Sequence, residues 1–571
     1  MAKTKIRKKK KSIEKIEENP ATPSGLTATP APVAESIAGD FKLEQNAKTL
    51  SGVDLKPFYG PEDVMALNYA QDLGHPGEYP YTRGVSKHET SSCPWVMQRF
   101  SSFGTAQETN SVFKSLFAQG ETQLLCHFDQ PTLAGYDSDH PRSFGYVGRN
   151  GVAVDTLADM EEIFRDIPVG RIAPFLASNA TAAILYCMYL GAAEKQGVNF
   201  KEVSGTVQND ILREFMTQNF CIFPLDPSFR LFSDLLKFSM TKTPHFNVVS
   251  VEGAALREAG ANAIQELAFS LANAFAYAGE ATKAGIEADA FLQRLWFTFG
   301  VHMDFFEEIA KFRSVRKIWA RWLREKYKIS NPHACELRFR AKTANISFSR
   351  QQPENNISRA TVEALAAVLG GAEGLYVNSM DEHQGIPGAA ASRLAMRIQQ
   401  IIAFESRATQ ATDPLGGAYF VEALTRRMEE EVENYFRKID EVGGVTQGIL
   451  SGYFQKEIAL NATGMQRDLD QGRRIVVGST RFRDGGEIFP VPPPKLESNP
   501  EKDQLERLKA VKKSRSRTGV QAALKDLRKT AMGKNGLIPR ILDCVREYAT
   551  VGEMISALKE GLGEYEPPSV F

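Results

Sequence analysis

The sequence predicts an α/β fold, a (β/α)8 TIM barrel with an N-terminal extension and a C-terminal helical appendage. Between about residues 121 and 410, short apolar runs alternate with longer runs of helical periodicity. Most of the apolar runs end in polar side chains. Seven or eight such units in roughly 290 residues favour a barrel over an open sheet. No GxGxxG or Walker sequence follows a predicted strand, which weakens a nucleotide-binding sheet as the alternative.

The composition is that of a soluble globular protein with one large domain and extensions. The chain has 571 residues, of which 43% are hydrophobic and 24% are charged. Its 69 basic and 69 acidic residues cancel, so the net charge indicates neither a nucleic-acid nor a membrane partner. No apolar run reaches the roughly 20 residues of a membrane span. Six scattered cysteines without CxxC spacing predict reduced thiols, with no disulfide or zinc knuckle, in a cytoplasmic protein.

Four segments are predicted along the chain. Residues 1–40 form a disordered tail, basic and then Pro-rich; docking on an acidic partner or RNA is the less favoured alternative. Residues 41–120 wrap around the barrel and contain an ordered, turn-rich loop at 74–84. Residues 121–420 form the barrel itself. Residues 421–571 form the helical extension, in which the Lys- and Glu-rich stretch 495–515 is expected to be an extended crossing.

The repeating pattern gives bounds for the barrel elements. The predicted strands are residues 123–128, 172–177, 205–208, 247–251, 294–299, 336–342 and 374–378. One further strand is expected near the later helices. The main helices are predicted at residues 156–164, 181–196, 255–278, 305–326, 358–369 and 390–405.

Polar side chains at the strand ends are expected to converge on one barrel mouth, where βα folds carry their chemistry. They are Phe128-Asp129-Gln130, Thr206-Gln208-Asn209, Glu252, Arg294, Lys342-Thr343 and Asn378-Asp381-Glu382-His383. At residues 205–218, Asn209 or Asp210 is placed to cap the following helix, and a well-capped strand–helix junction is the alternative to a functional site. No Ser-His-Asp, Cys-His or HExxH arrangement supports hydrolysis.

One loop could be pictured as a metal site. Asp137, Asp139 and His140 lie together in it, but the loop is dense in turn-forming residues. Hydrogen bonding within the loop and an ion pair with Arg142 are therefore the favoured interpretation.

Seven segments of the sequence resemble a known family. They are YPYTRG (79–84), PW (94–95), GYDSDHPR (135–142), TVQND (206–210), REAG (257–260), NSMDE (378–382) and DPLGG (413–417). In this order they resemble the barrel-forming large subunit of the methylmalonyl-CoA mutase family, from about residue 45 to the C-terminus.

The resemblance implies an enzyme that uses adenosylcobalamin to generate a 5′-deoxyadenosyl radical. The radical takes hydrogen from an acyl-CoA, and a substituent then migrates to the neighbouring carbon. The family's DxHxxG motif, which supplies the lower-axial histidine, does not occur in the sequence. The resemblance therefore implies no metal ligand from this chain, a separate small cobalamin-binding subunit, and a homodimer of large subunits within a heterotetramer.

The resemblance also implies roles for individual residues. The catalytic positions are Phe100, Gln208, Gln218 and Ala255; the cofactor-binding positions are Phe128, Asn150, Glu258, Glu382 and His383; and the substrate or CoA positions are Cys93, Gln98, Thr206, Arg294 and Trp296.

Several of these positions depart from the family pattern. Phe100 and Gln218 replace a tyrosine and the arginine that pairs with the substrate carboxylate, which predicts an uncharged migrating end of the isobutyryl or 2-hydroxyisobutyryl type. Ala255 replaces a histidine that donates to the thioester carbonyl. By the same resemblance, Phe175 and Trp296 replace small hydroxyl residues that line the tunnel for the acyl group, and they should narrow it. These departures leave two alternatives open: a radical mutase for a non-CoA or unusual acyl substrate, and a non-catalytic structural subunit.

Overall fold

The computed structural model describes residues 47–86, 95–99, 101–218, 220–385, 387–483 and 499–567. The contacts divide the chain into two units, Met1–Ala47 and Lys48–Phe571, and all the helices and strands described belong to the second. The predicted tail, residues 1–40, and the candidate residues Cys93 and Phe100 lie outside the described residues.

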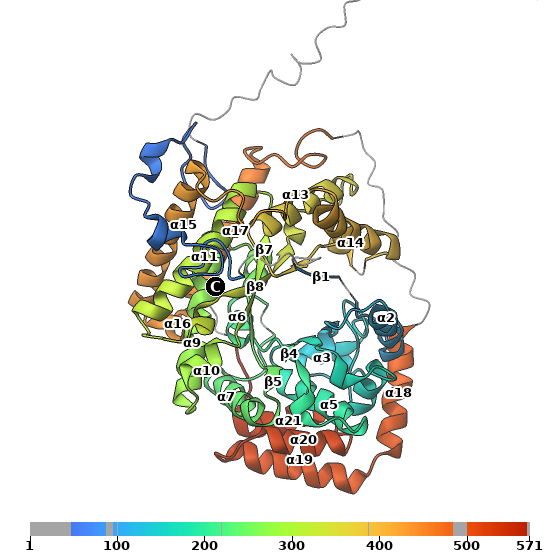
Figure 1. The fold of residues 1–571 in the computed structure, drawn as a ribbon. Coiled ribbons are helices and arrows are strands. Elements are labelled where there is room, and N and C mark those ends of the chain that lie inside the picture. Colours follow the sequence, from blue (N-terminus) through green and yellow to red (C-terminus); the bar gives the residue numbers. More distant parts are fainter. Residues whose placement is uncertain are drawn as a thin grey trace, which may run out of the picture. The chain divides into compact units, whose positions relative to one another are not determined.

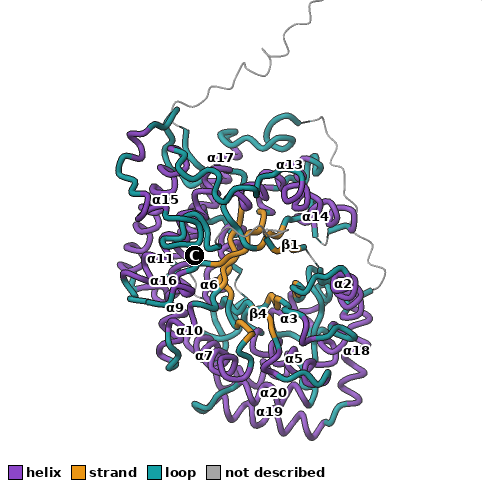
Figure 2. Tube along the Cα trace, in the orientation of Figure 1, coloured by secondary structure: helices purple, strands orange, loops and turns teal. Residues whose placement is uncertain are grey.

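Parallel strands form two sheets at the centre of the second unit (Figures 1 and 2). One sheet has the order β1-β9-β8-β7-β6, and the other has the order β2-β3-β4-β5. The strands are β1 (Val96–Gln98), β2 (Leu125–His127), β3 (Phe175–Ala177), β4 (Ser204–Val207), β5 (His245–Asn247), β6 (Ser250–Glu252), β7 (Trp296–Val301), β8 (Arg338–Thr343) and β9 (Gly374–Tyr376).

Taken together, the two sheets have the strand order of an eight-stranded parallel barrel, with β5 and β6 as two parts of one strand. The backbone N–H of Ser250, in β6, donates to the carbonyl oxygen of Gln208, which follows β4, at 2.8 Å. Between β1 and β2 the described residues form no ladder. Instead the Ser101 hydroxyl donates to the Leu125 carbonyl oxygen at 2.8 Å, and the His127 N–H donates to the Ser102 hydroxyl at 2.6 Å. A closed barrel ladder is therefore not shown.

The seven predicted strands are all present, although the one at residues 247–251 is divided. The expected eighth strand was placed wrongly: it is β1, which precedes all the predicted strands. Tertiary contacts hold this short strand. The Trp95 indole donates to Oε1 of Gln399, and Nε2 of Gln399 donates to the carbonyl oxygen of Gln98. No local alternation of three residues could have revealed it.

Helices surround the strands and continue into the C-terminal extension (Figure 1). They are α2 (Ala106–Ala118), α3 (Gln130–Ala134), α4 (Leu157–Ile163), α5 (Ala182–Lys195), α6 (Ile211–Met216), α7 (Leu225–Lys242), α8 (Gly253–Glu258), α9 (Ala263–Lys283), α10 (Ala288–Leu292), α11 (Phe305–Glu325), α12 (Pro332–Cys335), α13 (Asn355–Leu369), α14 (Ala389–Phe404), α15 (Tyr419–Glu441), α16 (Gly444–Leu450), α17 (Tyr453–Asp470), α18 (Pro500–Ser514), α19 (Arg517–Met532), α20 (Ile538–Arg546) and α21 (Val551–Leu562). None of the helices in the described ranges is both long and apolar enough to cross a bilayer.

The C-terminal helices complete the core. Helix α5 is apolar on all sides because it packs between β3 and α20, and twelve of its residues, Ala182 to Ala193, are buried. The prediction of an extended crossing at 495–515 was wrong, because α18 is a helix. The Asn499 side chain caps it, Pro500 occupies its first turn, and Nε2 of Gln504 donates to Oδ2 of Asp155 at 2.8 Å.

The acidic loop at 137–140 anchors the C-terminal extension. Asp137 accepts hydrogen bonds from the Thr550 hydroxyl and the Gly552 N–H, each at 2.7 Å. Lys512 pairs with Asp137 and Asp139. Hydrogen bonding is confirmed as the role of this loop, but the expected ion pair with Arg142 was wrong, since Arg142 donates to the Tyr136 hydroxyl. No group of three or more His, Cys, Asp or Glu side chains in the described ranges could hold a metal ion.

Candidate functional site

Two cavities lie inside the strands, one toward each end of the sheets. The upper cavity, toward the carboxyl ends, measures about 260 Å³, and the lower cavity measures about 220 Å³. Of the candidate residues, Gln98, Phe128, Asn150, Gln208, Gln218, Ala255 and Glu258 line the upper cavity. Thr206, Trp296 and again Gln98 line the lower one. The folding of parallel strands has thus brought candidate residues from β1 and from the segments after β2, β4 and β6 to one mouth.

A partition separates the two cavities. Gln98, Phe175 and Arg340 line both, and the Cζ atom of Arg340 lies 3.6 Å from the ring centroid of Phe175. The guanidinium is also fixed by its Nε, which donates to the Thr298 hydroxyl at 2.9 Å. Burial lowers the pKa of Arg340 to about 10, where it is still a cation at neutral pH. Of the two bulky residues noted in the sequence, Phe175 forms the partition, whereas Trp296 lines only the lower cavity.

Helix α6 supplies one wall of the upper cavity. Asp210 is its N-cap, and Asn209 before it has a positive φ of 47°, a conformation that asparagine tolerates. The helix carries Arg213 and Glu214, both 4% exposed, whose Nη1 and Oε1 atoms are 3.0 Å apart. The same Nη1 of Arg213 donates to Oε1 of Gln218 at 2.7 Å. Because its oxygen is engaged, Gln218 has its NH2 group left to donate to a ligand in the cavity.

The other wall comes from α8 and the ends of β8 and β9. Glu258 accepts hydrogen bonds from the N–H groups of Asn345, at 2.7 Å, and Ile346, at 3.2 Å. Glu382 accepts from the Tyr376 hydroxyl at 2.7 Å and from the Ser379 N–H at 3.0 Å. Burial raises the pKa of both carboxyls, and the charge of Lys342 opposes that rise.

The remaining candidate residues lie around this mouth or away from it. Glu382 and His383 belong to a short 3-10 turn beside it, and the His383 ring lies 6.4 Å from that of Phe348. Arg294 lines neither cavity; its guanidinium donates to the Phe246 carbonyl oxygen at 2.6 Å.

Some of the buried polar atoms without partners belong to residues that follow β8 and β9. Within the described ranges, Oδ1 of Asn345, Asn378 and Asp381 is buried and makes no hydrogen bond. Burying a polar atom in this way is costly, so such atoms at a mouth indicate the place of a polar ligand.

Sequence reasoning missed the cations inside the strands. In β8, Arg338, Arg340 and Lys342 alternate with the buried residues Phe339, Ala341 and Thr343. Lys342 was recognised only as a strand tip. The alternation was present in the sequence and could have predicted a column of three cations on one face of the strand. Arg213 was missed because its position in a helix gives no such signal.

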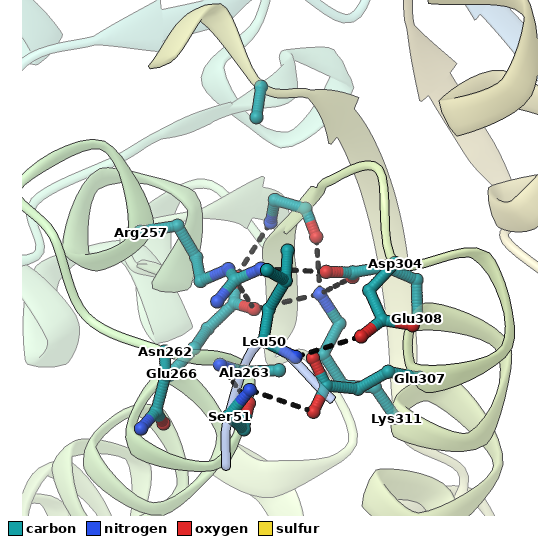
Figure 3. Close-up of polar contacts among 12 residues, drawn as sticks. Leu50, Ser51, Arg257, Asn262, Ala263, Glu266, Asp304, Glu307, Glu308 and Lys311 are labelled. Carbon is teal, nitrogen blue, oxygen red and sulfur yellow. Dashed lines mark hydrogen bonds and ion pairs between the residues drawn. The ribbon is translucent and has the colours of Figure 1, made fainter. Parts of the chain in front are cut away.

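A buried charge network holds α8 in place behind the upper cavity (Figure 3). Arg257 pairs with Glu308 at 2.7 Å, and Lys311 pairs with Glu266 at 2.8 Å. Glu266 also accepts from the Gly300 N–H at 2.6 Å. The network therefore joins α8, α9 and α11 to β7 and fixes the helix that carries two of the candidate residues.

The N-terminal segment is fastened to the same network. Oδ2 of Asp304 accepts from the Leu50 N–H at 2.8 Å, and Oε1 of Glu307 accepts from the Ser51 N–H at 3.2 Å (Figure 3). Burial, reinforced by the charge of Asp304, raises the pKa of Glu307 from its ordinary 4.5 to about 7.

This raised pKa predicts a pH-dependent stability. Because the folded protein holds the Glu307 proton more tightly than the unfolded chain, stability falls as the pH rises from about 4.5 to about 7. Glu307→Gln keeps the oxygen that accepts from Ser51 and removes the titration. Denaturant unfolding at pH 5 and pH 8 should show the wild type losing up to about 3 kcal/mol more than the variant over this interval. Equal losses in the two proteins would contradict the prediction.

The chain is similar to known proteins over most of its length. A family model described as methylmalonyl-CoA mutase matches residues 48–564. The 2-hydroxyisobutanoyl-CoA mutase large subunit of Aquincola tertiaricarbonis is 40% identical over 502 residues, which cover 88% of this chain and 89% of that protein. The methylmalonyl-CoA mutases of Rhizobium meliloti (strain 1021) and Cereibacter sphaeroides are 35% and 34% identical over 519 and 518 residues, and in each case the match covers 90% of this chain and 72% of the relative.

Proposed function

Because the chain belongs to the methylmalonyl-CoA mutase family, whose named members are isomerases, we propose that it is the large subunit of an adenosylcobalamin-dependent acyl-CoA mutase. Its substrate is an acyl-CoA with an uncharged migrating end, of the isobutyryl or 2-hydroxyisobutyryl type. The relative from Aquincola tertiaricarbonis, which is named a large subunit, supports a separate small cobalamin-binding subunit as partner.

The observation that carries this substrate class is the engaged state of Gln218. Its oxygen accepts from Arg213, and Arg213 is in turn paired with Glu214, so what Gln218 presents to the substrate is an amide NH2 group and not the guanidinium of an arginine. A carboxylate in the upper cavity would also face the carboxyl groups of Glu214, Glu252 and Glu258. An amide NH2 group suits a neutral acceptor instead, such as a hydroxyl oxygen.

The mouth of the upper cavity fits the proposed cofactor. Adenosylcobalamin supplies a 5′-deoxyadenosyl radical when bound. The unpartnered oxygens of Asn345, Asn378 and Asp381 are suited to its polar groups. We assign its binding to Phe128, Asn150, Glu258, Glu382 and His383. Gln208 and Gln218, which line the cavity, are assigned to orienting the acyl group. Phe100, which lies outside the described residues, is assigned to shielding the radical.

The pantetheine arm of CoA is assigned to the lower cavity, at Gln98, Thr206 and Trp296. Arg294, which lines neither cavity, and Cys93, which is outside the described residues, are assigned to CoA as well. The acyl end occupies the upper cavity. The partition at Phe175 and Arg340 lies between them, so CoA binding requires the Arg340 side chain to move.

Removing the partition is therefore expected to speed CoA binding. Phe175→Ala joins the two cavities and takes away the ring on which the Arg340 guanidinium lies. The association rate of isobutyryl-CoA, followed by stopped-flow tryptophan fluorescence, should rise by about tenfold, since a cation–π contact of about 1–2 kcal/mol no longer has to break. Phe404→Ala, at a residue that is 64% exposed on α14, is the control. An unchanged rate in Phe175→Ala would show that the partition does not limit entry.

The proposed activity is tested by reconstitution. The chain, purified with a small cobalamin-binding mutase subunit, is given adenosylcobalamin and, separately, isobutyryl-, 2-hydroxyisobutyryl- and methylmalonyl-CoA. Rearranged product from either of the first two, and none from methylmalonyl-CoA, is the expected result. Light scattering of the same sample should give the mass of a heterotetramer that contains two large subunits. Turnover of methylmalonyl-CoA alone would overturn the substrate class.

A second candidate is a non-catalytic structural subunit. The partition between the cavities and the alanine at 255 favour it. It predicts assembly with the small subunit but neither acyl-CoA binding nor turnover. A radical mutase that acts on a substrate other than a CoA ester predicts cofactor binding without acyl-CoA binding.

The five cysteines that the structure describes are all free, which supports the proposed cytoplasmic location.

A further inference from the structure

The ammonium group of Lys342 has no polar partner among the described residues. Its side chain lines the upper cavity, where Nζ lies 5.1 Å from the ring centroid of Tyr376. Neither a hydrogen bond nor an ion pair joins it to any residue in the described ranges. An ammonium carries three N–H donors. Because β8 places these donors in the cavity without an acceptor from the described residues, we expect the ligand to supply one.

Carboxyl groups near Lys342 are already satisfied by other donors. Glu258 accepts from two backbone N–H groups, and Glu382 accepts from a tyrosine hydroxyl and a backbone N–H. The upper cavity is lined by three basic side chains, Arg213, Arg340 and Lys342, and by three acidic ones, Glu214, Glu252 and Glu258. Because these charges balance, a neutral oxygen is the acceptor that fits.

The sheet brings Lys342 opposite α8. In the ladder between β7 and β8, Lys342 pairs with Gly300. Gly300 has no side chain, and a Cβ there would lie 3.1 Å from Cγ of Arg257 on α8. Helix α8 therefore lies close to β7 at the position where Gly300 pairs with Lys342. Ala254 and Ala255 of α8 line the upper cavity, as Lys342 does.

The two arginines of the upper cavity already make polar contacts, although Nε of Arg213 is buried without a partner. Arg340 donates to Thr298 and lies against Phe175, and Arg213 is paired with Glu214. The two alanines of α8 offer no donor. Gln218, which follows α6, is assigned to the migrating end of the proposed substrate.

We propose that Nζ of Lys342 donates a hydrogen bond to the thioester carbonyl oxygen of the bound acyl-CoA. This inference rests on the proposed function, and it assigns the donor that Ala255 does not provide. A charge-assisted hydrogen bond at this oxygen polarises the carbonyl and fixes the acyl group between Lys342 and Gln218.

The test measures the bound thioester directly and needs no cobalamin or turnover. Isobutyryl-CoA labelled with 13C at the carbonyl is bound to the full chain, and the carbonyl stretch is recorded by infrared difference spectroscopy. In the wild type and in Lys342→Arg the band should move to lower frequency than in water. In Lys342→Met the shift should be lost, and the affinity should fall about 10- to 100-fold, as expected for loss of a charge-assisted hydrogen bond.

Two controls separate this role from a structural one. The thioether analogue of isobutyryl-CoA, which has CH2 in place of the carbonyl, should bind equally to the wild type and to Lys342→Met. Lys283→Met, at a lysine side chain that is 76% exposed, should behave as the wild type in both assays. Thermal unfolding verifies that each variant is folded, and Lys342→Leu, which also lacks a donor, replaces Lys342→Met if the latter does not fold.

The outcomes distinguish this inference from the proposed function. If the wild type binds neither the thioester nor the thioether, the proposed function fails. If it binds the thioester but the carbonyl band is the same in Lys342→Met, only the role of Lys342 is overturned. An equal loss of affinity for thioester and thioether in Lys342→Met also overturns it, because Lys342 would then act on the shape of the cavity.

Discussion

Replacing Lys311 with methionine should destabilise the protein by about 3–5 kcal/mol, the usual consequence of removing one partner from a buried ion pair. The lysine is fully buried, and its Nζ contacts Glu266, Glu308 and the Gly300 carbonyl oxygen (Figure 3). Without it, two carboxylates remain in the core with Arg257 as their nearest cation. Urea unfolding followed by circular dichroism gives the change in midpoint and in free energy.

A matched control comes from the surface. Lys283 pairs with Glu280 within α9, and Lys283→Met should change stability by about 0–1 kcal/mol, as is usual for exposed pairs. A loss below about 1 kcal/mol in Lys311→Met would mean that Glu266 and Glu308 take up protons or water at little cost. In that case the network would not be what holds α8 against β7.

Replacing Arg213 with methionine should lower kcat/KM for the acyl-CoA by about 100-fold or more, because a misplaced positioning group has effects of this size. Arg213 holds the oxygen of Gln218 and balances the buried charge of Glu214. Without it, the Gln218 amide is free to rotate. Steady-state kinetics of the reconstituted enzyme with isobutyryl-CoA measure the effect.

The double variant Arg213→Met/Glu214→Leu shows whether the loss comes from stability or from positioning. Removing both charges takes away the unpaired carboxylate, so stability should recover toward that of the wild type. Activity should stay low, because Gln218 still lacks its partner. Recovery of both properties together would mean that Arg213 serves only to neutralise Glu214. Arg546→Met, at an exposed residue paired with Glu194, is the control for the loss of an arginine.

Periodicity was a sufficient guide wherever an element is long and has one buried face. Helices such as α11 and α14 begin and end within a residue of the predicted bounds, because their apolar residues recur at helical spacing. It failed at β1, whose three residues are held by contacts with Gln399 on α14. It also failed at α18, where charged residues predominate and the helix is established by its cap and by Asp155.

Only part of the expected convergence of strand-end residues on one mouth is found. Gln208, Glu252 and Lys342 line one cavity as expected. The expectation was wrong for Thr206, which lines the other cavity, and for Arg294, which lines neither because it precedes β7. The pairing of Arg213 with Gln218, the contact of Arg340 with Phe175 and the free ammonium of Lys342 were not predicted. Each of these depends on how side chains from different strands or turns meet.

By itself, the sequence determined the alternation of strands and helices and, through its resemblance to a family, the nature of the chemistry. Both are recorded locally, in the spacing of apolar residues and in short motifs. Only the tertiary structure decided that the space inside the strands is divided at Phe175, and that Gln218 is oriented by Arg213 while Lys342 is left free to donate. Which polar groups are satisfied is a property of neighbours in space, because buried hydrogen bonds form between residues far apart in the chain.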